Sequence, residues 1–229
     1  MTGTAGKKIL TAGLILTALF AVHTALIQTV DVRPVGQNGT DIGFAALNVP
    51  FHELTGVNMT LYTVTDWLGL VPIAVCMIFA VLGAVQLFTR RSLIKVDADI
   101  LLLGLYYIVV IAAYLIFEMI PINYRPVPID GYMEASYPSS TTLLVLSVMP
   151  TLSFQTRRRA GNTAVVYAAD ISALLFSVFM VAGRTISGVH WLTDITGSVL
   201  LSSGLYLVYH GCVLLIDRRK SQKSAGFTK

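Results

Sequence analysis

Six apolar runs, each close to the length needed to cross a bilayer, constrain this chain more than any other feature. A transmembrane helix needs about 20 mostly apolar residues in succession. The chain of 229 residues is 55% hydrophobic and only 12% charged, about half the charged fraction of an ordinary soluble domain. We therefore expect an all-α integral membrane bundle of six transmembrane helices. The expected spans are Ile9–Thr29, Trp67–Phe88, Ile100–Ile120, the shorter Ser140–Phe154, Ala164–Ala182 and Asp194–Ile216.

The positions of the lysines and arginines predict how these spans are oriented. Of the 16 Lys and Arg residues, all but Arg33, Arg125 and Arg184 lie near the N-terminus, in the second or fourth connection, or in the C-terminal tail. With six spans these four places share one side of the membrane, which the positive-inside rule makes cytoplasmic. We therefore expect both termini in the cytoplasm of a plasma-membrane protein. The net charge of +4 then reflects orientation, and we expect no nucleic-acid partner.

We expect a single membrane domain over residues 1–229, with a functional core at about 100–216. The longest polar connection, about Val30 to Asp66, mixes glycine and proline with apolar residues. That mixture is typical of a partly ordered cap on the outer membrane surface. In the last span a stripe of small residues predicts close approach of another helix. The stripe consists of Gly197, Gly204 and Gly211.

The stretch from Gly183 to Asp194, which reads GRTISGVHWLTD, places ionisable side chains between two expected spans. Such groups are costly at membrane depth and by default indicate a functional site, although an arginine at a loop end and a histidine at the interface are a purely structural alternative. If the chain is helical from His190 onward, His190 and Asp194 lie on one face. The carboxylate can then hold one imidazole nitrogen and leave the other free to attack. Arg184 offers a planar fork of donors that suits phosphate or carboxylate.

A second polar stretch precedes the fourth expected span. Four prolines between residues 121 and 138 exclude a continuous helix there. Pro138-Ser139-Ser140, followed by an apolar run, predicts a helix start with a serine cap and free backbone N–H groups. The N-terminus of such a helix can bind an anion. Arg125 lies in the same stretch.

These residues all fall at the outer ends of the last four spans, which predicts that they meet. Arginines and backbone N–H groups are the donors that a phosphoryl group requires, because its transfer depends on holding the equatorial oxygens and offering an in-line nucleophile. A histidine oriented by a carboxylate can be that nucleophile and form a phosphohistidine.

At this point the chain resembles the type 2 phosphatidic acid phosphatases, a family related to the vanadium haloperoxidases. One part of the family pattern is a serine and an arginine, then five residues, a histidine, three residues and an aspartate. Here the same spacing runs from Arg184 through His190 to Asp194, with Gly183 in place of the serine.

The other two parts of the pattern match less completely. Arg125 and Pro126 match the end of Lys-x-x-x-x-x-x-Arg-Pro, but Glu118 occupies the lysine position. The sequence Pro138-Ser139-Ser140-Thr141 keeps the Pro-Ser of Pro-Ser-Gly-His and lacks its Gly-His. The resemblance covers about Ile100 to Ile216, roughly half the chain.

The resemblance implies a role for each matching residue. It makes His190 the nucleophile and Asp194 the residue that orients it. Arg125, Arg184 and the helix start at Ser139 and Ser140 become the phosphate-binding residues. It also implies a reaction that uses no metal or other cofactor.

One departure from the family pattern bears on the chemistry. The family's second-motif histidine protonates the leaving oxygen, and Thr141 stands in its place. Three accounts are compatible with this: a lipid diphosphate substrate whose leaving group needs no acid, a buried Glu118 with a raised pKa that acts as the acid, or a lipid phosphate that is bound without turnover. Glu118 could instead form a structural ion pair with Arg125 or Arg184.

We therefore expect a membrane lipid phosphatase that hydrolyses a lipid phosphate or polyprenyl diphosphate at the outer face. The catalytic residues would be His190, Asp194 and Glu118. Its partners would be that lipid and the bilayer. The competing hypothesis is a non-catalytic lipid-phosphate binder or carrier on the same scaffold.

Overall fold

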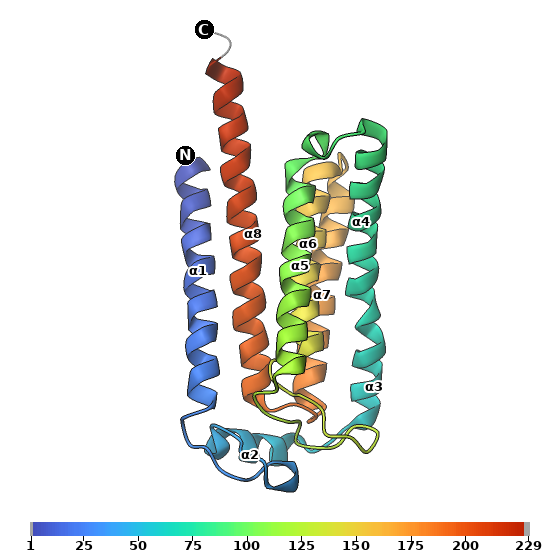
Figure 1. The fold of residues 1–229 in the computed structure, drawn as a ribbon. Coiled ribbons are helices and arrows are strands. Elements are labelled where there is room, and N and C mark those ends of the chain that lie inside the picture. Colours follow the sequence, from blue (N-terminus) through green and yellow to red (C-terminus); the bar gives the residue numbers. More distant parts are fainter. Residues whose placement is uncertain (1, 227–229) are drawn as a thin grey trace.

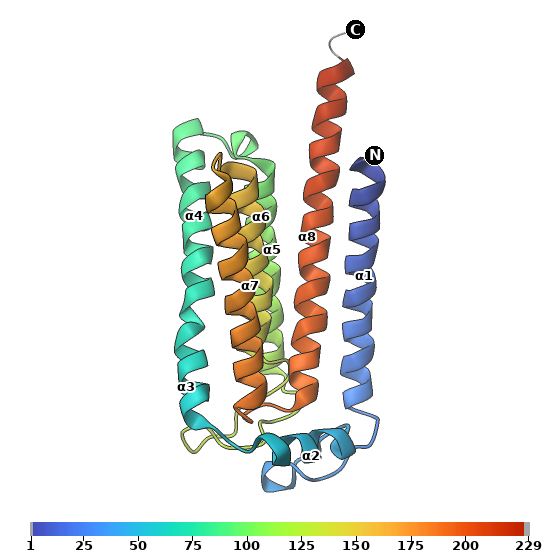
Figure 2. The same cartoon turned by 180° about the vertical axis from the view of Figure 1, so that it is seen from behind.

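The computed structural model describes residues 2–226, and over this range the chain is helical with no β-strand, as the sequence predicts (Figures 1 and 2). Seven of the eight α-helices in this range run along the bundle, with α3 and α4 end to end, and the short α2 crosses one end of it. The helices are α1 (Thr2–Ile27), α2 (Ala45–Thr55), α3 (Met59–Leu68), α4 (Leu70–Arg90), α5 (Ala98–Met119), α6 (Ser140–Arg159), α7 (Thr163–Ile186) and α8 (Leu192–Gly226).

Five helical stretches of residues 2–226 are long and apolar enough to cross a membrane: α1, the consecutive α3 and α4, α5, α7 and α8. Large apolar side chains on these helices face outward, including Ile78 of α4 and Leu175 of α7. The chain is therefore a multi-pass membrane protein. The predicted fourth span forms α6, which is not among the five, so the number of six spans stays a prediction.

Helix α6 lies inside the bundle, which explains why its sequence is less apolar than that of its neighbours. From Ser140 to Thr156 none of its side chains is exposed. Two of its buried polar side chains bond to neighbouring helices: the Tyr107 hydroxyl lies 2.6 Å from Thr151 Oγ1, and Gln155 hydrogen-bonds to Tyr209, whereas the Ser147 hydroxyl has no partner among the described residues. A helix enclosed by protein can carry polar side chains when most of them are hydrogen-bonded. The sequence therefore shows only a short apolar run there.

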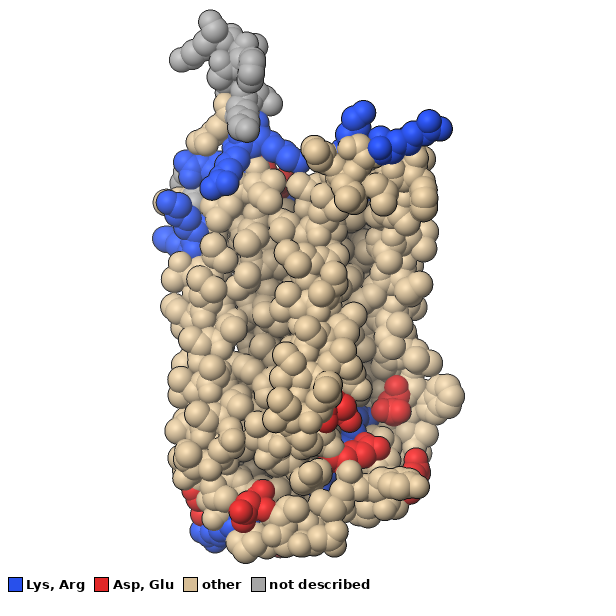
Figure 3. All heavy atoms as spheres, viewed as in Figure 1, with Lys and Arg blue, Asp and Glu red and all other residues tan. Residues whose placement is uncertain are grey.

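The two ends of the bundle differ in charge and in the segments they carry. The first residues of α1 and the end of α8 lie at one end, where most of the visible lysines and arginines gather (Figures 1 and 3). At the other end lie α2 and the long connection between α5 and α6, together with most of the visible acidic side chains. The residues of the predicted site belong to this second end.

The outer cap is smaller than the sequence predicts. We expected it to run from Val30 to Asp66, but Met59–Leu68 forms α3, which continues into α4 after Gly69. The part outside the bundle is therefore a loop followed by α2. The stretch after Asn58 is amphipathic and continues into the next membrane helix, so the cap ends before it.

Helix α1 packs along α8, and the glycine stripe is the reason it can come close. A Cβ atom on Gly204 would lie 2.6 Å from Thr17 Oγ1, and one on Gly211 would lie 2.8 Å from the backbone nitrogen of Leu10. Neither position has room for a larger side chain. Helix α1 therefore makes the predicted close approach to α8. Gly197 instead packs against the ring of Tyr137.

Candidate active site

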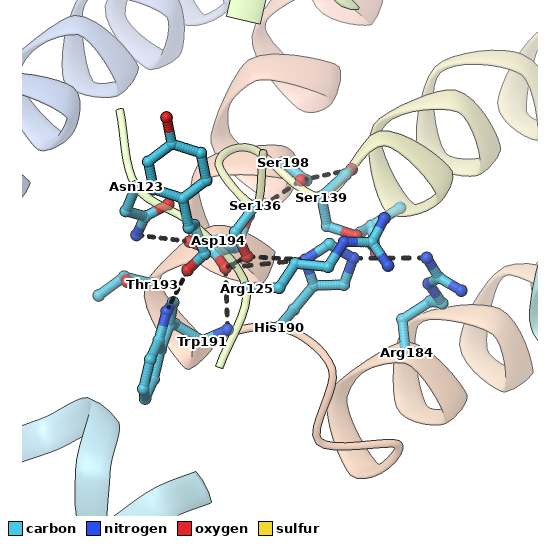
Figure 4. Close-up of polar contacts among 12 residues, drawn as sticks. Asn123, Arg125, Ser136, Ser139, Arg184, His190, Trp191, Thr193, Asp194 and Ser198 are labelled. Atoms are coloured by element: carbon cyan, nitrogen blue, oxygen red, sulfur yellow. Dashed lines mark hydrogen bonds and ion pairs between the residues drawn. The ribbon is translucent and has the colours of Figure 1, made fainter. Parts of the chain in front are cut away.

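Two stretches that are distant in sequence meet at the end of the bundle opposite the chain termini (Figures 1 and 4). The connection between α5 and α6 contributes Asn123, Arg125 and Ser136. Helix α7 contributes Arg184 near its C-terminus, and the short turn into α8 contributes His190, with Asp194 in the first turn of α8. All six of these side chains are buried.

The side chain of Ser136 lies between His190 and Asp194. Nδ1 of His190 is 3.7 Å from Oδ2 of Asp194, which is beyond hydrogen-bond distance. The Ser136 hydroxyl lies 3.2 Å from Nδ1 of His190 and donates a short hydrogen bond to Oδ2 of Asp194. The predicted histidine–aspartate pair is therefore connected through a serine.

Asp194 is held by further donors around its carboxylate. Asn123 Nδ2 donates to Oδ1 at 3.2 Å, and the backbone N–H of Trp191 donates to Oδ2 at 2.8 Å. With Ser136, these bonds occupy both oxygens of a side chain that is fully buried. The carboxylate is accordingly fixed in orientation.

The tautomer of His190 follows from its neighbours. Nε2 lies 3.4 Å from NH2 of Arg184, and a guanidinium can only donate, so Nε2 faces it with its lone pair. The proton is then on Nδ1 and points to the Ser136 oxygen, which passes its own hydrogen to Asp194. Burial, and then the positive charges of Arg125 and Arg184, lower the pKa of His190 well below its usual value. A neutral imidazole with an available Nε2 lone pair is the nucleophilic form.

Arg125 and Arg184 are almost fully buried, and each has guanidinium atoms without a hydrogen-bond partner. The unpaired atoms are Nε and NH1 in both side chains. Both guanidiniums lie over the ring of Tyr62, with Cζ 5.6 Å from the ring centroid for Arg125 and 4.7 Å for Arg184. Buried charged donors without partners are energetically costly unless an anion binds them. The pair therefore has the chemistry of an anion site beside Nε2 of His190.

Two carboxylates border this anion site. Glu134 Oε2 lies 3.0 Å from NH2 of Arg125, and Asp66 Oδ1 lies 3.6 Å from NH1 of Arg184. Their side chains are much more exposed than the arginines, 38% and 55% against 8% and 1%. Because a solvated carboxylate binds weakly, an incoming phosphate can compete with both.

The N-terminus of α6 lies next to Asp194. The helix begins at Ser140 with Ser139 at the N-cap position, as predicted, but the expected capping bond is absent: Ser139 makes no side-chain bond to the backbone, and its hydroxyl donates to Thr142 Oγ1 at 3.1 Å. Its N–H donates to the Asp194 carbonyl at 3.3 Å, and its carbonyl accepts from Ser198. The N–H groups of Ser140 and the next two residues belong to the first turn, where no intrahelical acceptor exists.

Glu118 lies apart from this hydrogen-bonded cluster. It is exposed in the last turn of α5, so the expectation of a buried acid is wrong. Within residues 2–226 the ion-pair partners of Arg125 and Arg184 are Glu134 and Asp66, so a pairing with Glu118 is also wrong. Glu118 does line a small surface pocket together with Ser140.

The cap and the loop that carries His190 are joined by close contacts. Asn58 N–H donates to the Ser187 carbonyl at 3.0 Å, and Asn48 of α2 bonds to Thr193 through both its amide atoms. Gly188 has φ of +68°, and a Cβ atom there would lie 1.8 Å from the Gly56 carbonyl oxygen. Only glycine fits this conformation in this space.

Several residues of the site were not predicted from the sequence: Asn123, Ser136, Asp66, Glu134 and Tyr62. Asn123, Glu134 and Ser136 lie in the proline-rich connection that also holds Arg125, so an irregular polar segment next to a phosphate motif was a usable signal. Asp66 and Tyr62 come from α3, which lies outside every matching motif. Nothing in their spacing connects them to the site.

Comparisons with known proteins place the fold. No family model matches the sequence, and no curated protein sequence is recognisably similar to it. In fold, however, this multi-pass membrane protein is similar to the PAP2-type phosphatases. The crystal structure of a transmembrane PAP2-type phosphatidylglycerolphosphate phosphatase from Bacillus subtilis matches with a TM-score of 0.62 at 18% sequence identity, covering 87% of this chain and 94% of that one.

Proposed function

We propose that this protein is a membrane phosphatase that hydrolyses a lipid phosphate or polyprenyl diphosphate through a phosphohistidine. The observation that carries the proposal is the buried pair Arg125 and Arg184, whose unpaired donors lie beside Nε2 of His190, the ring nitrogen that carries the lone pair. This arrangement supplies the two requirements of phosphoryl transfer, which are bound equatorial oxygens and a nucleophile in line with the leaving group.

In the proposed first step Nε2 of His190 attacks phosphorus while the arginines and the first-turn N–H groups of α6, from Ser140 onward, hold the phosphoryl oxygens. The bond from phosphorus to the leaving oxygen breaks, and its electron pair departs with the leaving group. The imidazole becomes positively charged but keeps its Nδ1 proton, and the charge is stabilised by Asp194 through Ser136. Water then attacks phosphorus, the P–N bond breaks toward Nε2, and inorganic phosphate leaves.

The residues around the anion site also bear on which leaving group the reaction can release. Thr141 cannot donate a proton at neutral pH, and the carboxylates nearest the arginines, Asp66 and Glu134, act as their counter-ions. We therefore favour a lipid diphosphate, because its leaving group is a phosphate that departs without protonation. Glu118 is the alternative proton donor. Replacement by glutamine tests it: unaltered turnover and an unaltered pH profile rule it out, whereas a loss of about 10² or more supports it.

The charge distribution supports a location for the site. Most of the visible basic side chains lie at the end of the bundle that carries the termini (Figure 3), and the candidate site lies at the opposite end. With the positive-inside rule, this arrangement supports our inference that the termini are cytoplasmic and that the site faces outward from a plasma membrane. A protease or membrane-impermeant label applied to sealed cells tests this orientation.

The second candidate is a lipid-phosphate binder that does not turn its ligand over, and the presence of Thr141 in place of a histidine favours it. One assay separates the two functions: phosphate release from a polyprenyl diphosphate and from phosphatidic acid by the purified protein. Release that disappears in His190→Ala and persists in His210→Ala, a histidine that packs at a tilt against Phe154 away from the site, supports the phosphatase. Binding of the same lipids without any release supports the binder.

A further inference from the structure

Tyr137 directly follows Ser136 in the connection between α5 and α6, and its side chain reaches α1. The side chain is almost completely buried, with 1% exposed. Its hydroxyl lies 2.9 Å from Oγ1 of Thr24 and 3.1 Å from Nδ1 of His23. Both of these residues belong to α1, which stands at the edge of the bundle beside α8 (Figures 1 and 2). The resemblance to the phosphatase family does not include α1, yet this helix is bonded to the residue next to the bridging serine.

The direction of these hydrogen bonds follows from their neighbours. Thr24 donates its hydroxyl hydrogen to the Phe20 carbonyl at 2.9 Å, so its oxygen is left to accept from the Tyr137 hydroxyl. The phenol oxygen then accepts from Nδ1–H of His23. The phenol is thus both a donor and an acceptor toward α1. A buried hydroxyl whose bonds run in one consistent order is held in orientation as well as in place.

The ring of Tyr137 is enclosed by three helices. It stacks on Phe20 of α1, with ring centroids 5.9 Å apart and planes 3° apart. Phe117 of α5 meets it edge-on, with centroids 5.8 Å apart and planes at 85°. On the side of α8, a Cβ atom on Gly197 would lie only 2.4 Å from the ring. The ring therefore has little room to move, and its hydroxyl bonds set how far it reaches toward α1.

Ser136 has to be placed closely for its hydroxyl to reach both His190 and Asp194. Hydrogen bonds weaken outside a range of about 2.7 to 3.2 Å, and a displacement of about 1 Å near a reacting group can cost about 10² in rate. The connection that carries Ser136 has no regular secondary structure at this point. The N–H of Ser136 donates to the Asn123 carbonyl at 3.0 Å, which fixes one side. Tyr137, the next residue along the chain, fixes the other.

We propose that Tyr137 is a positioning residue through which α1 holds Ser136 in the bridge. His23 and Thr24 hold the phenol, and one peptide bond links Tyr137 to Ser136. The Ser136 hydroxyl then lies where it orients the His190 imidazole. Tyr137 acts through Ser136 rather than on the phosphoryl group, because its hydroxyl is bonded to α1. Its effect on turnover rests on the proposed function, whereas its effect on the His190 ring does not.

Tyr137→Phe removes the hydroxyl and keeps the ring in its place. We expect kcat for a polyprenyl diphosphate to fall about 10-fold, the loss of one hydrogen bond, with KM nearly unchanged. The matched control is Tyr106→Phe, which removes another buried tyrosine hydroxyl, one that donates to the Ser147 carbonyl at 2.8 Å between α5 and α6. Its kcat should equal that of the wild type. Wild-type kcat in Tyr137→Phe, or equal losses in the two variants, would overturn the proposal.

Two further comparisons separate positioning from a general loss of stability. In the Ser136→Ala background Tyr137→Phe should cause no further fall in kcat, because the group that it positions is gone, and losses that multiply would overturn the proposal. His23→Leu removes the donor to the phenol and should lower kcat about 3- to 10-fold. His23→Asn, whose amide can replace Nδ1–H, should restore it. Equal kcat in the two His23 variants would overturn the role assigned to α1.

Nitrogen NMR of the His190 ring, in the full-length protein in lipid nanodiscs, is a test that does not depend on turnover. The His190 signals are identified by their loss in His190→Ala. Tyr137→Phe should shift the Nδ1 resonance in the same direction as Ser136→Ala does, and Tyr106→Phe should leave it unchanged. This shift in a protein that releases phosphate from no substrate would refute the phosphatase and keep the positioning role. An unchanged resonance in Tyr137→Phe would refute the positioning role and leave the phosphatase standing.

Discussion

The imidazole of His190 and the carboxylate of Asp194 are not in direct hydrogen-bond contact: 3.7 Å separates Nδ1 from Oδ2. Ser136 bridges them, because it accepts from the imidazole and donates to the carboxylate. The four-residue spacing on the sequence thus brings the two side chains close, and a residue more than 50 positions earlier completes the connection. The orientation of the proposed nucleophile, His190, therefore depends on this serine.

Replacing Ser136 by alanine should reduce kcat by about 10- to 100-fold, the loss expected for a hydrogen bond to a charged group. KM should change little, because Ser136 does not contact the anion site. Ser136→Thr keeps the hydroxyl and should recover activity. Ser202→Ala, a buried serine of α8 away from the site, is the control. Wild-type kcat in Ser136→Ala would show that the imidazole is oriented without the bridge.

The pH dependence follows from the lowered pKa of His190. In the proposed mechanism the neutral imidazole is the active form, and a pKa below the usual value of about 6.5 keeps it neutral as the pH falls through 6.5. Activity in kcat/KM should therefore persist to below pH 6.5 and be lost only under more acidic conditions.

The positive charge of Arg125 helps to lower the pKa of His190. The variant Arg125→Gln therefore tests the direction of this pKa shift. Removal of the charge should raise that pKa and shift the acid limb of kcat/KM to higher pH. NMR titration of the His190 ring in the free protein measures the same change without substrate. A shift to lower pH would contradict the account.

The anion site can be tested with inorganic phosphate or vanadate as the ligand. Arg184→Lys keeps the charge but removes the planar fork, and we expect its affinity for either anion to fall about 10- to 100-fold. Arg33→Gln, which changes an exposed arginine of the cap, should bind as the wild type does. Isothermal titration or anion-dependent thermal stabilisation gives the affinities. Equal binding by Arg184→Lys and the wild type would remove Arg184 from the site.

Gly188 gives a prediction for stability. Alanine at Gly131 should cost about 1 kcal/mol through its positive φ alone, because its surroundings are open. Alanine at Gly188 has the same backbone cost and also meets the Gly56 carbonyl oxygen. We expect a loss of about 3 kcal/mol or more, seen as a larger drop in Tm at equal scan rate, together with reduced activity. Equal Tm values for Gly131→Ala and Gly188→Ala would show that the cap moves aside freely from the Gly188 position.

The sequence predicted those parts of the molecule that depend on local pattern. Apolar runs identified the membrane helices, and the spacing from Arg184 through His190 to Asp194 identified a site at one end of the bundle. The bounds of α6 were predicted less well, because a helix enclosed by protein is not selected for apolar side chains throughout. The extent of the cap was overestimated because α3 continues into α4 with only Gly69 between them.

The remaining features depend on contacts between distant segments. The position of Ser136 between two side chains of another segment is set by the path of an irregular connection, which has no periodicity. The placement of Asp66 against Arg184 is set by how α3 packs on α7. Glu118 was predicted to be buried because it aligns with a family lysine. The side chain is exposed, because it lies at the end of α5.

The central claim is that Nε2 of His190 receives the phosphoryl group. Rapid quenching of the protein during turnover of a polyprenyl diphosphate labelled on its terminal phosphorus tests it most directly. We predict an acid-labile, base-stable phosphate bound at His190, and neither this label nor phosphate release in His190→Ala. Phosphate release that continues in His190→Ala, or turnover without labelled His190, would contradict the account.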